Sequence, residues 1–150
     1  MRPPPIAPEP GWTPVQPFPS LEPHSFLVAN PSGESVRIAY FRGPAAGRLY
    51  ARAWFGRETQ GPPGYVHGGA MAAVLDEAMG GAAWMNGHPS VAAKISVSFI
   101  EMLKLETETT VEAWVERTEG RKIYLRAKLL NPTATMVAEA DGLFIVLKQT

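Results

Sequence analysis

The sequence predicts an α+β protein in which a curved antiparallel sheet of about six strands wraps around one long central helix. One proline-free segment, residues 69–85, is too long for a single buried strand and has the length of a helix. The segments on either side of it alternate apolar and polar residues with the two-residue period of half-buried strands. One helix beside several such strands is an α+β arrangement.

The expected strands follow in chain order. Two precede the helix and four follow it, at residues 35–41, 48–58, 93–99, 111–116, 122–129 and 134–148. Glu119-Gly120 can form a tight hairpin turn, which would place an acidic strand face beside a basic one in an antiparallel pair. Asn86-Gly87 supplies a left-handed C-cap for the helix.

Proline separates the N-terminal segment from the rest of the chain. Ten of the 15 prolines lie in residues 1–31. Proline lacks an amide donor and fixes φ, so the first 23 residues cannot join a sheet interior or a helix. We therefore expect residues 1–23 to be a proline-rich extended arm and residues 24–150 to be one folded domain.

The composition excludes several classes of function. Fourteen basic and 14 acidic side chains leave no net charge, which disfavours a nucleic-acid surface or an electrostatic membrane anchor. The chain has no cysteine, which excludes a thiol nucleophile, disulfides and cysteine-ligated zinc. No secretory or transmembrane segment is evident. We expect a soluble cytoplasmic protein with no metal, nucleic-acid or membrane partner.

The predicted helix is unusually apolar. Between Ala70 and Met85 its only polar side chains are Asp76 and Glu77, so we expect it to be buried by the curved sheet, by a second subunit, or by both. Burial of an unpaired carboxylate costs several kcal/mol, in order of magnitude. Asp76 therefore either pairs with a basic residue across an interface or lies on an exposed edge of the helix. Alternatively, it acts as a base or nucleophile in a dry pocket. Glu77 points about 100° away and is expected to be structural.

The turn before the helix, His67-Gly68-Gly69, has two possible roles. Its glycines either let the helix pack tightly or present free first-turn amides to an oxyanion. His67 is either a hydrogen-bonding turn residue or a catalyst. Asp76 lies on the order of 10 Å along the helix axis from the turn. If both act on one bond, they come from different subunits of a dimer.

The sequence resembles the hotdog-fold acyl-CoA thioesterases of the His-Gly-Gly…Asp branch, the phenylacetate-type group of the thioesterase superfamily. The residues that carry the resemblance are His67-Gly68-Gly69, then Asp76 nine positions after the histidine, with flanking Gly61-Pro62-Pro63-Gly64-Tyr65-Val66 and Leu75-Asp76-Glu77-Ala78. It extends from about Phe26 to Leu147. It implies a homodimer with a continuous sheet and two interfacial sites, or a tetramer built from two dimers.

The resemblance also implies roles for individual residues. Asp76 would activate water or attack the thioester carbonyl, and the Gly68 amide, supported by His67 or Gly69, would receive the oxyanion. The substrate would be an acyl-CoA, with coenzyme A as its leaving group and no separate cofactor. Gly69, Met71, Met79 and Ser96 would line the substrate pocket.

One departure from the family pattern keeps other functions open. The family often has Thr or Ser near the start of the strand after the helix, where this chain has Ala92, with Ser90 or Ser96 as possible replacements. Ser96 would have to face the site. The missing hydroxyl favours a non-catalytic protein that binds acyl-CoA or acyl-carrier protein. A 3-hydroxyacyl thioester dehydratase is a further alternative, but it needs an upstream histidine that residues 50–64 lack.

Overall fold

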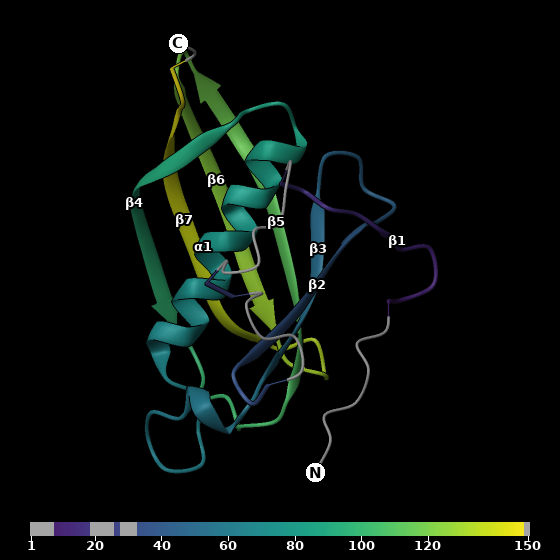
Figure 1. Cartoon of the computed structure of the whole chain (residues 1–150), viewed down its shortest axis with the longest axis vertical. Coiled ribbons are helices and arrows are strands. Elements are labelled where there is room, and N and C mark those ends of the chain that lie inside the picture. The colour runs from purple at the N-terminus through teal and green to yellow at the C-terminus, as the bar shows by residue number, and fades with distance from the viewer. Residues whose placement is uncertain (1–7, 19–25, 28–32, 149–150) are drawn as a thin grey trace.

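The computed structural model describes residues 8–18, 26–27 and 33–148. These residues form one α-helix and one seven-stranded antiparallel sheet (Figure 1). The elements are β1 (Thr13–Pro14), β2 (Val36–Arg42), β3 (Leu49–Phe55), the short 3-10 helix η1 (Arg57–Thr59), α1 (Gly68–Met85), β4 (Ser90–Phe99), β5 (Glu108–Glu119), β6 (Lys122–Leu130) and β7 (Met136–Val146). The predicted α+β class is confirmed, and β1 is an addition to the six expected strands.

The order of strands across the sheet is β1-β2-β3-β5-β6-β7-β4. The hairpin between β5 and β6 has the expected antiparallel pairing, with Glu119 opposite Lys122 and Gly120 in the turn at φ +59°. Glu112 lies opposite Lys128 and forms an ion pair with it at 3.6 Å. Partly exposed pairs of this kind contribute at most about 1 kcal/mol, so they help to set register more than stability.

The helix packs on one face of the sheet, which we call the inner face (Figure 1). Buried side chains from β3, β5 and β6 meet it there: Leu49, Ala51, Ala53, Phe55, Val111, Ala113, Ile123, Leu125, Ala127 and Leu129. Val74, Leu75 and Ala78 of α1 are buried against them. The helix ends as predicted, because Gly87 adopts φ +86° directly after the C-cap residue Asn86.

The N-terminal segment contacts both faces of the sheet. β1 pairs with β2 at the sheet edge, a position that tolerates its proline. Trp12 packs on Phe41 and Tyr50, with ring centroids 5.5 and 5.1 Å away, on the outer face. Pro17 and Phe18 reach the inner side and lie against α1. The segment therefore covers the β2 edge of the sheet. The predicted domain boundary near residue 24 lies outside the described residues.

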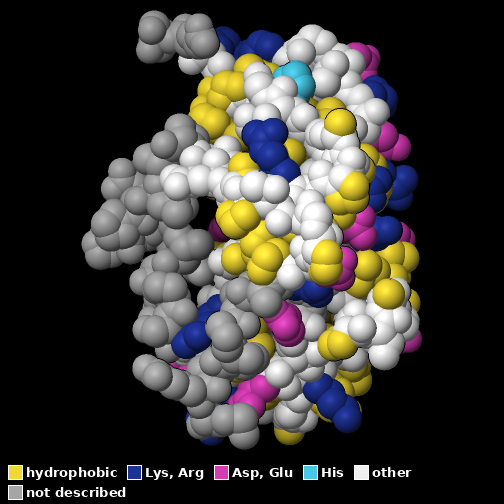
Figure 2. Space-filling view, turned by 90° about the vertical axis from the view of Figure 1, so that its right-hand side faces the viewer, with side chains coloured by type: hydrophobic (Ala, Val, Ile, Leu, Met, Phe, Trp, Pro, Cys, Tyr) yellow, Lys and Arg dark blue, Asp and Glu magenta, His cyan; other side chains and the backbone are white. Residues whose placement is uncertain are grey.

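The outer face of the sheet carries charges of both signs. Figure 2 views the molecule from the side of β1 and β2, and acidic and basic side chains are interleaved along its right-hand margin. Arg48 and Glu112 form one such pair at 2.9 Å, and Arg126 and Glu116 another at 3.8 Å. Within the described residues, no helix is long and apolar enough to cross a membrane.

Two adjacent helix glycines provide a test of this packing. A Cβ at Gly80 would lie 3.5 Å from Phe144, an ordinary contact, whereas a Cβ at Gly81 would lie 2.9 Å from Leu49 and 3.2 Å from Pro17. Gly80→Ala should raise the free energy of unfolding by about 0.5–1 kcal/mol, because alanine favours the helix. Gly81→Ala should lower it by about 1 kcal/mol through overpacking. Chemical denaturation of both variants measures the difference, and equal effects would contradict the close packing of Gly81 against Leu49 and Pro17.

Candidate active site

The turn that begins α1 is organised by His67. Its Nδ1 accepts a hydrogen bond from the Gly69 amide at 2.7 Å, so His67 is the N-cap of the helix. Its carbonyl accepts from the Ala70 and Met71 amides at 3.0 and 3.3 Å. Among the described residues, the Gly68 amide is the one first-turn donor with no recorded acceptor. Because Nδ1 is an acceptor, the neutral ring carries its proton on Nε2.

Close packing explains why this turn needs glycine. A Cβ at Gly69 would lie 2.9 Å from Nδ1 of His67 and would disturb the cap. A Cβ at Gly68 would lie 3.3 Å from the ring of Phe99, at the end of β4. Both readings of the glycine pair, tight packing and a free amide, are therefore compatible with the turn. The Gly68 amide lies beside the β4 edge of the sheet.

Asp76 lies on the side of α1 that faces away from the sheet. Val74, Leu75 and Ala78 are fully buried on the sheet side, and the helical period puts Asp76 roughly opposite them. The carboxylate is half-buried and has no hydrogen bond or ion pair within the described residues. Burial raises the pKa of Asp76. A partly desolvated carboxylate of this kind is a stronger base than one in water.

Glu77 has a partner of its own. The hydroxyl of Tyr40, on β2, donates to Oε1 of Glu77 at 2.5 Å. Burial and the nearby Asp76 raise the pKa of Glu77, and the Tyr40 hydrogen bond opposes them. The predicted direction of Glu77, away from Asp76, agrees with this contact.

One chain does not bring Asp76 and Gly68 to the same atom. Eight residues of helix separate them, or about 12 Å along the axis at 1.5 Å per residue. A cavity of about 310 Å³ opens beside the turn and is lined by His67, Gly69 and Ala73 of the helix region and Val36 of β2. The cavity is next to the Gly69 side of the turn, and Asp76 is not among its lining residues.

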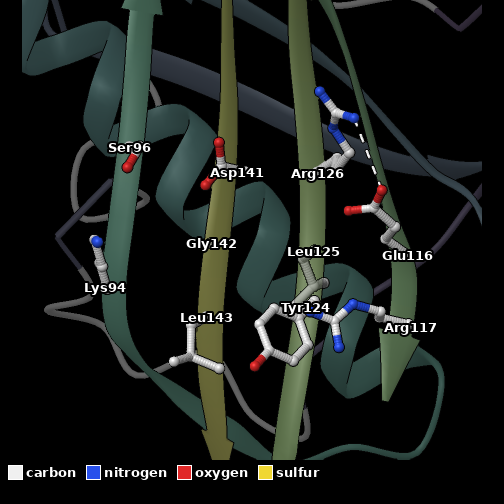
Figure 3. Close-up of a pocket in the computed structure, with 10 residues that line it drawn as sticks. All are labelled: Lys94, Ser96, Glu116, Arg117, Tyr124, Leu125, Arg126, Asp141, Gly142 and Leu143. Carbon is white, nitrogen blue, oxygen red and sulfur yellow. Dashed lines mark ion pairs between the residues drawn. The ribbon is translucent and has the colours of Figure 1, made fainter. Parts of the chain in front are cut away.

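Three of the residues predicted for the substrate pocket lie in the core or on the outer face of the sheet. Met71 and Met79 are core residues, and the side chain of Met79 packs against Gly142 of β7. Ser96 lies on the outer face, in a hollow that it shares with Lys94 and Asp141 (Figure 3). Successive residues of a strand point to opposite faces, so Ser96 cannot turn toward α1 without a change of register. The assignment of these three residues to a substrate pocket therefore stays a prediction.

The position expected to carry a hydroxyl lies in an irregular part of β4. The pairing with β7 shifts between Ala92 and Lys94, which leaves Ala93 as an extra residue. Ser90 does not replace the hydroxyl near Asp76, because its carbonyl accepts from Trp84 Nε1 at the far end of the helix. Asp76 lies halfway along α1, level with the middle of β4.

Comparison with known proteins identifies the family. The profile of the thioesterase superfamily matches residues 63–138, from the turn through α1 into β7. The chain belongs to the thioesterase superfamily. Acyl-coenzyme A thioesterase THEM4 of Bos taurus is 34% identical over 89 residues, which are 59% of this chain and 36% of that protein. The chain spans about a third to a half of the length of the curated relatives it matches.

Solved members of the thioesterase superfamily share the fold. PaaI of E. coli, from the phenylacetic acid degradation operon, superposes with a TM-score of 0.69 at 17% identity, covering 81% of this chain and 86% of that chain. A hypothetical thioesterase from Streptococcus pneumoniae, solved with coenzyme A, gives 0.68 at 17% identity, covering 77% and 91%. Together with the one-helix antiparallel sheet, they confirm the predicted hotdog fold.

The raised pKa of Asp76 has a consequence for stability. The folded protein holds this proton more tightly than the unfolded chain, so Asp76 weakens the fold as the pH rises through its folded pKa. Asp76→Asn should raise Tm by about 2 °C near pH 7, and the gain should disappear below about pH 4, where aspartate is protonated in both states. Thermal unfolding over this pH range measures it. Asp141→Asn, on the exposed outer face, is the control, and a gain independent of pH would contradict the prediction.

Proposed function

We propose that this protein hydrolyses acyl-CoA thioesters to the free acid and coenzyme A, at a site shared by two copies of the chain. The observation that carries the proposal is the separation of two groups that have no partner among the described residues. The Asp76 carboxylate and the Gly68 amide suit the two halves of thioester hydrolysis, yet about 12 Å of helix lies between them in one chain. A second copy is the simplest source of the complementary half.

The chemistry follows from the two groups. Asp76, as general base, takes a proton from a water molecule that adds to the thioester carbonyl. The carbonyl oxygen becomes an oxyanion and accepts a hydrogen bond from the Gly68 amide, at the positive end of the helix dipole. Collapse of the intermediate breaks the carbon–sulfur bond, and the coenzyme A thiolate takes up the proton. Direct attack by Asp76, with later hydrolysis of the anhydride, gives the same products.

The β4 edge of the sheet supports one position for the second copy. β1 occupies one edge, and β4 is the other, with ten residues and no proline. Exposed apolar side chains follow this edge: Val91, Phe99, Ile100 and Met102. A long apolar edge strand favours pairing with another strand. Because Gly68 packs on Phe99, pairing of β4 with its symmetry mate would put the turn at the interface.

The substrate class is supported by related proteins. The Bos taurus relative is named an acyl-coenzyme A thioesterase, and the Streptococcus pneumoniae neighbour was solved with coenzyme A. Ala92 favours a second candidate, a protein that binds acyl-CoA or acyl-carrier protein without hydrolysis, because no hydroxyl from β4 helps to place a water. We favour hydrolysis because half-burial of an unpartnered Asp76 has a cost that a purely binding protein would not need.

Thiol release from a panel of short, medium, long and aryl acyl-CoAs tests the proposal. Asp76→Asn should lower kcat at least about 100-fold, the contribution expected of a general base. Asp141→Asn, the same change on the outer face, should leave kcat unaltered. Equal rates for the native protein and Asp76→Asn would exclude Asp76 from the mechanism. Acyl-CoA binding without thiol release would favour the binding protein.

A further inference from the structure

Within the part of the chain that the structure describes, one side-chain hydrogen bond joins β2 to the middle of α1. Tyr40 and Glu77 are 37 residues apart, both are half-buried, and their oxygens lie 2.5 Å apart. A hydrogen bond this short to a carboxylate is typical of charge-assisted bonds, which are stronger than neutral ones. Glu77 is also the residue next to Asp76 on α1.

Apart from hydrogen bonds near the helix ends, such as that from Trp84 to Ser90, the packing of α1 is apolar, and much of it involves small side chains. Ala78, Gly81 and Ala82 are buried in the interface between α1 and the sheet. Apolar packing is not directional, so it specifies the rotation of a helix about its axis less sharply than a hydrogen bond does. The bond from Tyr40 fixes the direction of Glu77, and the helical geometry then fixes Asp76 about 100° away.

The other charged groups lie away from this turn of the helix. Arg52, Glu112, Arg126, Asp141 and Lys94, from the strands that pack on α1, lie on the outer face. Within the described residues, Tyr40 is the titratable side chain that the sheet directs toward Asp76 and Glu77, while His67 and Glu58 lie at the helix start. Asp76 therefore has one close carboxylate neighbour, Glu77, and no close cation.

The phenol stays a donor throughout the working range of pH. Burial, followed by the charge of Glu77, raises the pKa of Tyr40 well above its usual value, and Asp76 adds to the effect. A protonated Tyr40 stabilises the charged form of Glu77, as the opposing effects on the pKa of Glu77 show. The contact is therefore a phenol bound to a carboxylate, beside a second carboxylate.

We propose that Tyr40 and Glu77 are positioning residues for the hydrolysis, and that their hydrogen bond holds the turn of α1 that carries Asp76. The inference rests on the proposed function and extends it. Tyr40 and Glu77 act through Asp76 and have no contact with the reacting bond. A fixed direction of the Asp76 carboxylate keeps it aimed at the water that it deprotonates, as a general base requires.

Two variants separate the hydrogen bond between Tyr40 and Glu77 from the charge of Glu77. Tyr40→Phe removes the donor and keeps the ring, while Glu77→Gln keeps an acceptor for Tyr40 and removes the charge. Tyr40→Phe should lower kcat about 10- to 100-fold, because a displaced catalytic group is costly, with KM changed by less than about twofold. Glu77→Gln should retain most of kcat, because the amide oxygen of glutamine still accepts the hydrogen bond from Tyr40.

The outcomes distinguish this inference from the proposed function. No turnover by the native protein overturns both. Native turnover with an unchanged kcat in Tyr40→Phe, or a kcat that falls as far in Glu77→Gln as in Tyr40→Phe, overturns the positioning role alone. If Tyr40→Phe does not fold, Glu77→Leu replaces it: loss of kcat in Glu77→Leu with retention in Glu77→Gln supports the role, and equal rates in the two refute it.

Discussion

Enclosure of an apolar helix is the constraint on which this fold depends. Sixteen residues from Ala70 to Met85 contain two charged side chains, so nearly the whole surface of α1 is apolar, and nine of its 18 residues are buried. The sheet covers one side, and Pro17 and Phe18 cover part of the other near Gly80 and Gly81. The strip of the α1 surface that no described residue covers carries Asp76. The β4 edge, which we propose as the contact with a second subunit, lies beside the Gly68 turn, so under this proposal one contact completes both the fold and the site.

Under the proposed function, half-burial of Asp76 lowers the stability of the fold and raises the basicity of the carboxylate. Half-burial of the Asp76 carboxylate, which has no partner among the described residues, weakens the fold. The same burial raises the pKa of Asp76, which suits a general base. Two hydrogen bonds restrict the motion of the helix start and of the turn that carries Asp76. His67 caps the helix start through the Gly69 amide, which leaves the Gly68 amide free, and Tyr40 binds the residue next to Asp76. Directional hydrogen bonds thus position two groups that apolar packing alone would hold loosely.

Local sequence patterns predicted most of the fold but only part of the site. Two-residue periodicity located six strands, and Gly87 and Gly120 fixed a helix end and a hairpin, because these signals depend on near neighbours. The placement of Trp12 on the outer face depends on contacts far along the chain. No local sequence pattern indicates the bulge at Ala93. Met79 lies in the core, and its position in the helical period was compatible with either the core or a pocket. Tyr40 was detectable in principle, since it follows Val36 and Ile38 on the inner face as the one polar tip.

A mixed-subunit experiment tests the shared site most directly. Gly68→Pro removes the amide donor at the first helical position, where proline is tolerated, and Gly68→Ala controls for the added Cβ beside Phe99. When Gly68→Pro and Asp76→Asn chains, each nearly inactive alone, are co-expressed, half of the dimers are hybrids with one intact site, so roughly a quarter of native activity should return. Activity no higher than the mean of the two variants would contradict a site built from Asp76 of one subunit and Gly68 of the other.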